Sequence, residues 1–130
     1  EVDLRPLLTR VAELEAAGRE LNAAVQGALS RLPRPDPATL ARLNAQLLQV
    51  ERNWLHDPGI PGRPWFKHLL YSARYTYAHL ELPGLTEAME AGKWDAAKEQ
   101  ARILEEAVAK NTALLREARA GIEPRATGNK

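Results

Sequence analysis

The stretch PGIPGRPWFKHLLYSARYTYAHLELPG, residues 58–84, interrupts a sequence that otherwise follows the periodicity of α-helices. It holds four of the nine prolines and all three tyrosines of the chain. A segment of this length without regular structure is uncommon in a compact domain, and is usually either functional or disordered. Its aromatic content argues against disorder. We therefore expect residues 58–84, called the insert below, to pack on the helices that flank it.

Before the insert, apolar residues recur at steps of three and four, which predicts two amphipathic helices. The first is expected from Val2 to Leu32, with a stripe of Leu4, Leu7, Val11, Leu14, Leu21, Val25, Ala28 and Leu32. The prolines of residues 33–37 end this helix, because proline lacks the backbone N–H and clashes with the preceding turn. Asp36 is a candidate N-cap for the second helix, with Pro37 as its first residue.

After the insert, the same spacing predicts a short helix over residues 85–91 and a long helix behind it. Gly92 can end the short helix in a left-handed conformation, and Asp95 is the expected N-cap of the long one. Asn111 is the polar member of the long apolar stripe and is expected at its edge. The glutamates of these helices, Glu87 among them, are expected on solvated faces.

These elements indicate an all-α fold: a four-helix bundle-like domain with a long irregular insert between the second and third helices. Residues 1–120 form the domain, and residues 121–130 are expected to fray as a C-terminal tail, because they have little apolar surface to bury.

Composition excludes several classes of function. The net charge is +1, from 18 basic and 17 acidic residues, and no basic stripe suggests nucleic acid as a partner. No apolar run approaches the roughly 20 residues of a membrane span, so no membrane segment is expected in this stretch. The chain has no cysteine, which excludes disulfides and thiolate metal sites.

The residues themselves suggest little catalytic chemistry, and no catalytic residue and no metal site are expected. His56, His68 and His79 do not follow the spacing of known metal ligands. Arg63 and Lys67 could each hold a carboxylate, or could lie over a neighbouring aromatic ring. The run from Arg74 to Tyr77 offers a guanidinium, two phenols and a hydroxyl, which suit either an anionic ligand or a protein interface.

Three consecutive motifs resemble those of the transferrin receptor-like dimerisation domain, the C-terminal helical domain of glutamate carboxypeptidases and transferrin receptors. They are LNAQLLQVERNWL (residues 43–55), PGRPWFKHLLYS (61–72) and YTYAHLELPGLTEAM (75–89). The order of the motifs is the specific feature. The likeness extends from about Leu4 to Arg119.

The resemblance implies a non-catalytic homodimerisation domain of a zinc-dependent exopeptidase, whose zinc lies in a peptidase domain outside these residues. The partners are then a second copy and the peptidase domain of the same chain, in a periplasmic or secreted protein. In the carboxypeptidases, a Lys-Tyr pair before the Pro-Gly holds the substrate's C-terminal glutamate. Tyr77 matches the tyrosine and Thr76 replaces the lysine, so Arg74 is the candidate for the missing charge. The residues expected to anchor the insert are Arg63, Pro64, Trp65, Phe66 and His68.

Two other functions stay open at this point. The transferrin receptors have this domain without catalysis, so the chain could be a receptor-like module that binds a protein. It could also be an independent small enzyme or metal protein.

Overall fold

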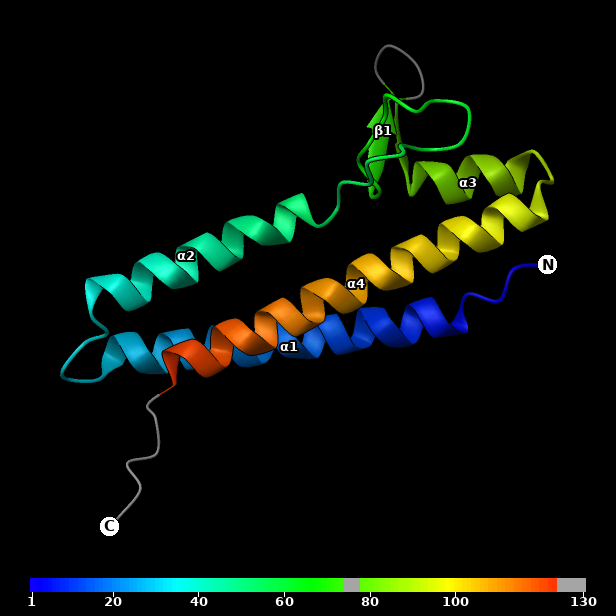
Figure 1. Cartoon of the computed structure of the whole chain (residues 1–130). Helices are drawn as coiled ribbons and strands as arrows, with labels where there is room; N and C mark the ends of the chain where they lie inside the picture. The colour runs from blue at the N-terminus through cyan, green and yellow to red at the C-terminus, as the bar shows by residue number, and fades with distance from the viewer. Residues whose placement is uncertain (74–77, 124–130) are drawn as a thin grey trace.

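The computed structural model describes residues 1–73 and 78–123. Its helices are α1 (Arg5–Ser30), α2 (Pro37–Arg52), α3 (Pro83–Glu90) and α4 (Trp94–Ile122), and two short strands, β1 (Tyr71–Ala73) and β2 (His79–Glu81), lie between α2 and α3 (Figure 1). The prediction of an all-α domain with its insert between the second and third helices is confirmed. No helix in the described part of the chain is long and apolar enough to cross a membrane.

The long helix α4 is the common partner of the other three helices. The helix α1 runs parallel beside it, α2 runs antiparallel over its C-terminal half, and α3 packs at its N-terminal end (Figure 1). The largest cluster of buried side chains joins α4 to α1, α3 and the insert, and consists of Leu7, Trp54, Leu69, Leu85, Ala88, Ala97, Ala101, Ile103, Leu104, Ala107 and Val108. A second cluster joins the C-terminal end of α4 to α1 and α2, and consists of Leu21, Ala28, Leu43, Ala118 and Ile122.

The helix ends largely follow the local sequence. The Asp36 side chain accepts a hydrogen bond from the Thr39 backbone N–H at 2.9 Å, so the predicted N-cap of α2 is confirmed. Gly92 has a φ of +65°, as predicted for a residue that ends α3. The prediction of Asp95 as N-cap is wrong: α4 already begins at Trp94, which places Asp95 in the first turn. A carboxylate there still complements the positive end of the helix dipole.

The apolar stripe of α1 is narrower than the sequence predicts. Leu7, Leu21 and Ala28 are buried, but Val11 is 45% exposed and Leu32 is 90% exposed. The helix ends at Ser30, so Leu32 lies in the connection that follows it. Val11 is exposed because α4 covers only one side of α1.

The prediction that Asn111 lies at the edge of its stripe is also wrong. Its side chain is fully buried. It accepts a hydrogen bond from Asn53 Nδ2 at 2.7 Å and donates one to the Val50 carbonyl at 3.2 Å. Both partners stand at the C-terminal end of α2, so a polar contact inside the core fixes where α2 meets α4.

The insert is more regular than its sequence suggests. The strands β1 and β2 pair antiparallel, with Tyr71 opposite Glu81 and Ala73 opposite His79. Toward the C-terminus, α4 continues through Ile122 and so includes the first two residues of the expected tail. Residues 124–130, to which the rest of that expectation refers, lie outside the described residues.

Candidate functional site

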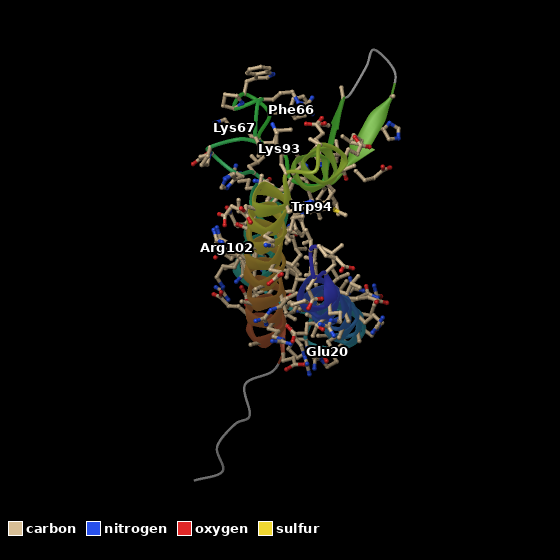
Figure 2. All side chains as sticks on the ribbon, turned by 90° about the vertical axis from the view of Figure 1, so that its right-hand side faces the viewer. Glu20, Phe66, Lys67, Lys93, Trp94 and Arg102 are labelled. Carbon is tan, nitrogen blue, oxygen red and sulfur yellow. The ribbon has the colours of Figure 1, made fainter. Side chains whose placement is uncertain are left out.

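The insert lies at one end of the molecule, where α4 begins. Figure 2 shows Phe66 and Lys67 above Lys93 and Trp94, whereas Glu20 lies on the opposite part of the molecule, on α1. The insert enters from Trp54, whose buried side chain belongs to the main core cluster and whose carbonyl accepts from the Leu69 N–H at 2.9 Å. This bond joins the middle of the insert to the residue that leads into it, at the surface of the core.

The first half of the insert is a compact double turn. Ile60 N–H donates to the Phe66 carbonyl at 3.0 Å, and Arg63 N–H donates back to the Ile60 carbonyl at 3.0 Å. Gly59 has a φ of +74°, and a Cβ at this position would lie 2.3 Å from the Pro64 carbonyl oxygen. Only glycine allows that approach of one backbone to another. Pro64 is exposed, and its backbone lies close against Gly59.

Arg63 links this turn to two other elements. Its guanidinium donates to the Ala73 carbonyl at 2.9 Å and to Ser72 Oγ at 3.3 Å, both on β1. It also forms an ion pair with Glu87 on α3, and both side chains are less than a third exposed. The prediction that Glu87 lies on a solvated face is therefore wrong. Sequence reasoning could not pair the two residues, because nothing local connects positions 24 residues apart.

His68 holds the second half of the insert. Its Nδ1 accepts a hydrogen bond from the Leu70 backbone N–H at 3.2 Å, so the proton of the neutral ring is on Nε2. Nε2 lies 3.2 Å from a carboxylate oxygen of Glu51, near the end of α2. The imidazole also packs on the Tyr71 ring, with centroids 4.2 Å apart. Glu51 is the partner that sequence reasoning missed.

The expected anchors Phe66 and Trp65, and Lys67 between them and His68, differ in how they contact the chain. Phe66 is half-buried under the Arg63 guanidinium, 5.1 Å from its ring centroid to Cζ. Lys67 donates to the Asp57 carbonyl instead of holding a carboxylate. Trp65 is 71% exposed, so its indole packs little on this chain.

The expected substrate contacts Tyr77, Thr76 and Arg74 fall between β1 and β2 in the sequence, outside the described residues. Among the residues that the structure does describe, no group of three or more histidine, aspartate or glutamate side chains could hold a metal ion. His56 and His79, which belong to different parts of the insert region, are not brought together with His68 as ligands.

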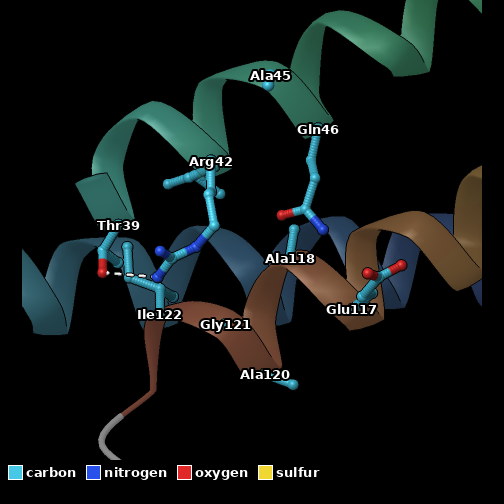
Figure 3. A pocket seen from close by; sticks show the side chains of 10 residues that line it. Thr39, Arg42, Ala45, Gln46, Glu117, Ala118, Ala120, Gly121 and Ile122 are labelled. Atoms are coloured by element: carbon cyan, nitrogen blue, oxygen red, sulfur yellow. Dashed lines mark hydrogen bonds between the residues drawn. The ribbon is translucent and has the colours of Figure 1, made fainter. Parts of the chain in front are cut away.

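A groove of about 560 Å³ lies between α2 and the C-terminal end of α4, whereas the insert lies at the N-terminal end of α4 (Figure 3). Leu43, Ala118 and Ile122 form its apolar wall, and Arg42, which donates to Thr39 Oγ1 at 3.0 Å, stands at its edge. It contains no histidine and no pair of carboxylates, and therefore has none of the usual groups of a catalytic centre.

The shifted pKa values belong to surface ion pairs and a helix cap. Hydrogen bonds from Arg102 lower the pKa of Glu99 on α4, and those from Arg5 lower the pKa of Asp3 to about 2. These carboxylates stay ionised at neutral pH, which suits an exposed ion pair and not a general acid.

Comparison with known proteins gives the same family as the insert motifs. The model of the transferrin receptor-like dimerisation domain matches residues 2–116. A probable glutamate carboxypeptidase of Zea mays is 43% identical over 60 residues, which is 45% of this chain. A probable glutamate carboxypeptidase of Arabidopsis thaliana is 28% identical over 97 residues, 71% of this chain. An inactive zinc metalloprotease of Schizosaccharomyces pombe is 35% identical over 60 residues, 45% of this chain.

The matched region is a small part of each of these relatives. It covers 8% of the Zea mays protein, 13% of the Arabidopsis thaliana protein and 8% of the Schizosaccharomyces pombe protein.

Proposed function

The chain belongs to the transferrin receptor-like dimerisation domain family, and from this premise we propose that it pairs with a second copy of itself within a zinc-dependent exopeptidase. The match of the family model over nearly the whole chain is the observation that carries this proposal. The domain supplies no catalytic group of its own. It steadies a peptidase domain of the same protein by holding two copies together.

Exposed apolar side chains on the single chain support pairing. A surface that a second copy covers needs a contiguous apolar centre, and large apolar residues are exposed on α1, on α2 and just after α2: Leu8, Val11, Leu47, Leu48 and Leu55. A two-fold contact would use the same patch on both copies.

Sedimentation velocity on the 130-residue chain and on the full-length protein tests the pairing. We expect a dimer for the full-length protein and a concentration-dependent monomer–dimer equilibrium for the chain alone. A full-length protein that stays monomeric at every concentration would contradict the proposal.

The second part of the proposal concerns the insert, which we place at the wall of the substrate pocket. The resemblance to glutamate carboxypeptidases assigns the Tyr77 phenol to a substrate carboxylate, with Thr76 where a lysine stands in the family and Arg74 as the nearby cation. Tyrosine O–H and arginine N–H are suitable donors to a carboxylate. The firm attachment of the insert to the core through Arg63 and His68 supports a role that requires fixed geometry.

Kinetics of the full-length protein on peptides that end in glutamate test this role. Tyr77→Phe removes one hydrogen bond to the carboxylate, so we expect KM to rise about tenfold. Tyr71→Phe is the matched control, because Tyr71 lies in the same insert and packs on His68. Unchanged kinetics for Tyr77→Phe would remove Tyr77 from the pocket.

The relative named as an inactive zinc metalloprotease favours a second candidate, in which the parent protein uses the domain to bind a protein without catalysis. Zinc content of the purified full-length protein separates the two. About one or two equivalents of zinc, together with peptidase activity, support the exopeptidase, because the metal activates the attacking water. Neither zinc nor activity supports the non-catalytic alternative. Calorimetric zinc binding by the 130-residue chain alone would instead favour an independent metal protein.

A further inference from the structure

Arg63 is the anchor of the insert whose side chain hydrogen-bonds to strand β1 of the β1–β2 hairpin and also forms an ion pair with a helix of the scaffold. Its guanidinium donates to the Ala73 carbonyl at 2.9 Å and to Ser72 Oγ at 3.3 Å, and pairs with Glu87 on α3. Ser72 is itself buried. The contact with Ser72 is therefore partly buried, whereas the contact with the Ala73 carbonyl is exposed.

Other contacts, independent of those with β1 and Glu87, also hold Arg63 in place. Its backbone N–H donates to the Ile60 carbonyl at 3.0 Å, and its carbonyl accepts from the Phe66 N–H at 2.9 Å. Its guanidinium also lies over the Phe66 ring. A planar, charged fork with this support loses little conformational freedom when it binds two acceptors at once.

The helix α3, which carries Glu87, is firmly packed against the rest of the molecule. The first turn of α3 is packed into the core, since Pro83, Gly84 and Leu85 are all buried. Glu87 follows within the same helix, so its backbone has a fixed position relative to α4. Through Glu87, the position of β1 is tied to the helical scaffold and not only to its partner strand β2.

We propose that Arg63 is a positioning residue for substrate binding: it fixes the end of β1 against α3 and thereby sets the affinity of the pocket to which the insert contributes. This inference rests on the proposed role of the insert in the substrate pocket. Arg63 does not touch the substrate. Its effect on the reaction passes through the backbone of Ala73.

Hydrogen exchange and steady-state kinetics on the full-length protein test the proposal, with Arg63→Lys as the main variant. Lysine keeps the charge opposite Glu87, but one ammonium cannot reproduce the fork to Ala73 and Ser72. We expect exchange in peptides covering residues 71–73 and 79–81 to become about tenfold faster, the loss of about one charge-assisted hydrogen bond. KM for the peptide substrate should rise severalfold while kcat stays constant.

Two further variants make the result specific. Glu87→Gln leaves the fork to β1 in place and removes the ion pair, so it should show the same changes at smaller size. Arg102→Lys is the matched control, because Arg102 forms ion pairs with Glu99 and Glu106 on the exposed side of α4. It should change neither exchange in the hairpin nor KM.

Each outcome bears on the proposal. Unchanged exchange and unchanged KM in Arg63→Lys would overturn it, as would faster exchange spread evenly over all helices, which indicates global destabilisation. Faster exchange confined to the hairpin with an unchanged KM would overturn the substrate role. A full-length protein without any peptidase activity would contradict the proposed function, whereas the exchange result would still decide whether Arg63 positions β1.

Discussion

Asn53 Nδ2 donates to Asn111 Oδ1 at 2.7 Å, across 58 residues of sequence and inside the core. Asn111 uses its own amide to reach the Val50 carbonyl at 3.2 Å, so both ends of its side chain bind the last turns of α2. The next residue after Asn53 is Trp54, which begins the path into the insert. The pair therefore sets the point from which the insert leaves the helices.

Replacement of Asn111 by alanine should destabilise the chain by about 1–3 kcal/mol, because the buried Asn53 amide and the Val50 carbonyl both lose a partner. The measurement is the free energy of unfolding from urea denaturation. Thr112→Val is the matched control: Thr112 is also buried, but its hydroxyl donates to the Val108 carbonyl of its own helix. Equal losses in the two variants would contradict a special role for the Asn53 contact.

Gly59 and Gly62 allow a comparison between backbone conformation and close packing. Both have positive φ, +74° and +79°, but an added Cβ would strike the Pro64 backbone at Gly59 and meet no atom within 4 Å at Gly62. Each alanine variant should lose about 1 kcal/mol from its left-handed conformation. Gly59→Ala should lose about 1–3 kcal/mol more through the clash. Thermal and urea unfolding measure the difference between the two variants. Equal stabilities of Gly59→Ala and Gly62→Ala would mean that the backbone around Pro64 can move away from the added Cβ without loss of stability.

The cap at Asp36 should make stability depend on pH. Hydrogen bonds from the Thr39 backbone N–H and then from its hydroxyl lower the pKa of Asp36 below the ordinary 3.8. A lowered folded pKa stabilises the native state above the unfolded pKa, and this contribution is lost as pH falls through the folded value. The melting temperature of Asp36→Ala should therefore lie below that of the parent at pH 7. The gap should shrink as the pH falls through the lowered folded pKa, below which both states bind the proton.

Asp36→Asn is the control for the cap, because asparagine is also a good N-cap but carries no titratable group. Its difference from the parent should be small at pH 7. A pH-independent gap between Asp36→Ala and the parent would show that the carboxylate charge adds nothing to the cap.

The two tryptophans of the insert region should differ in their effect on stability. Trp54 is buried in the main cluster, and its replacement by alanine should cost about 3–5 kcal/mol in unfolding free energy. Trp65 is 71% exposed, and its replacement should change stability by less than about 0.5 kcal/mol. A large loss for Trp65→Ala in the 130-residue chain would show that its indole is an internal anchor after all.

The sequence predicts the helices well, because their signals are local. Alternating steps of three and four, the cap at Asp36 and the glycine at position 92 each act within one or two turns, and the structure follows them. The short strands β1 and β2 carry no such signal. Three residues are too few for a strand period, and their pairing depends on hydrogen bonds between segments that only the fold brings together.

The contacts that hold the candidate site together join residues that are far apart in the sequence. Arg63 meets Glu87, and Glu51 meets His68, from positions that no spacing rule connects. The burial of Asn111 was missed for the same reason. An asparagine in an apolar stripe is expected at the edge of the stripe unless its hydrogen-bond partner on another helix is known. Residue types in the motif predicted that the insert is held firmly, and only the structure identifies the partners.

The helix on which α1, α2 and α3 all pack is also the last part of the domain to leave the ribosome. Until residues 94–122 have been synthesised, the apolar faces of the earlier helices have no surface to cover them. The nascent chain must then stay soluble with side chains such as Leu7, Leu43 and Trp54 uncovered, a state that favours chaperone binding and aggregation. A premature stop before Trp94 would leave no partly working domain, because it removes the one element that every other helix needs.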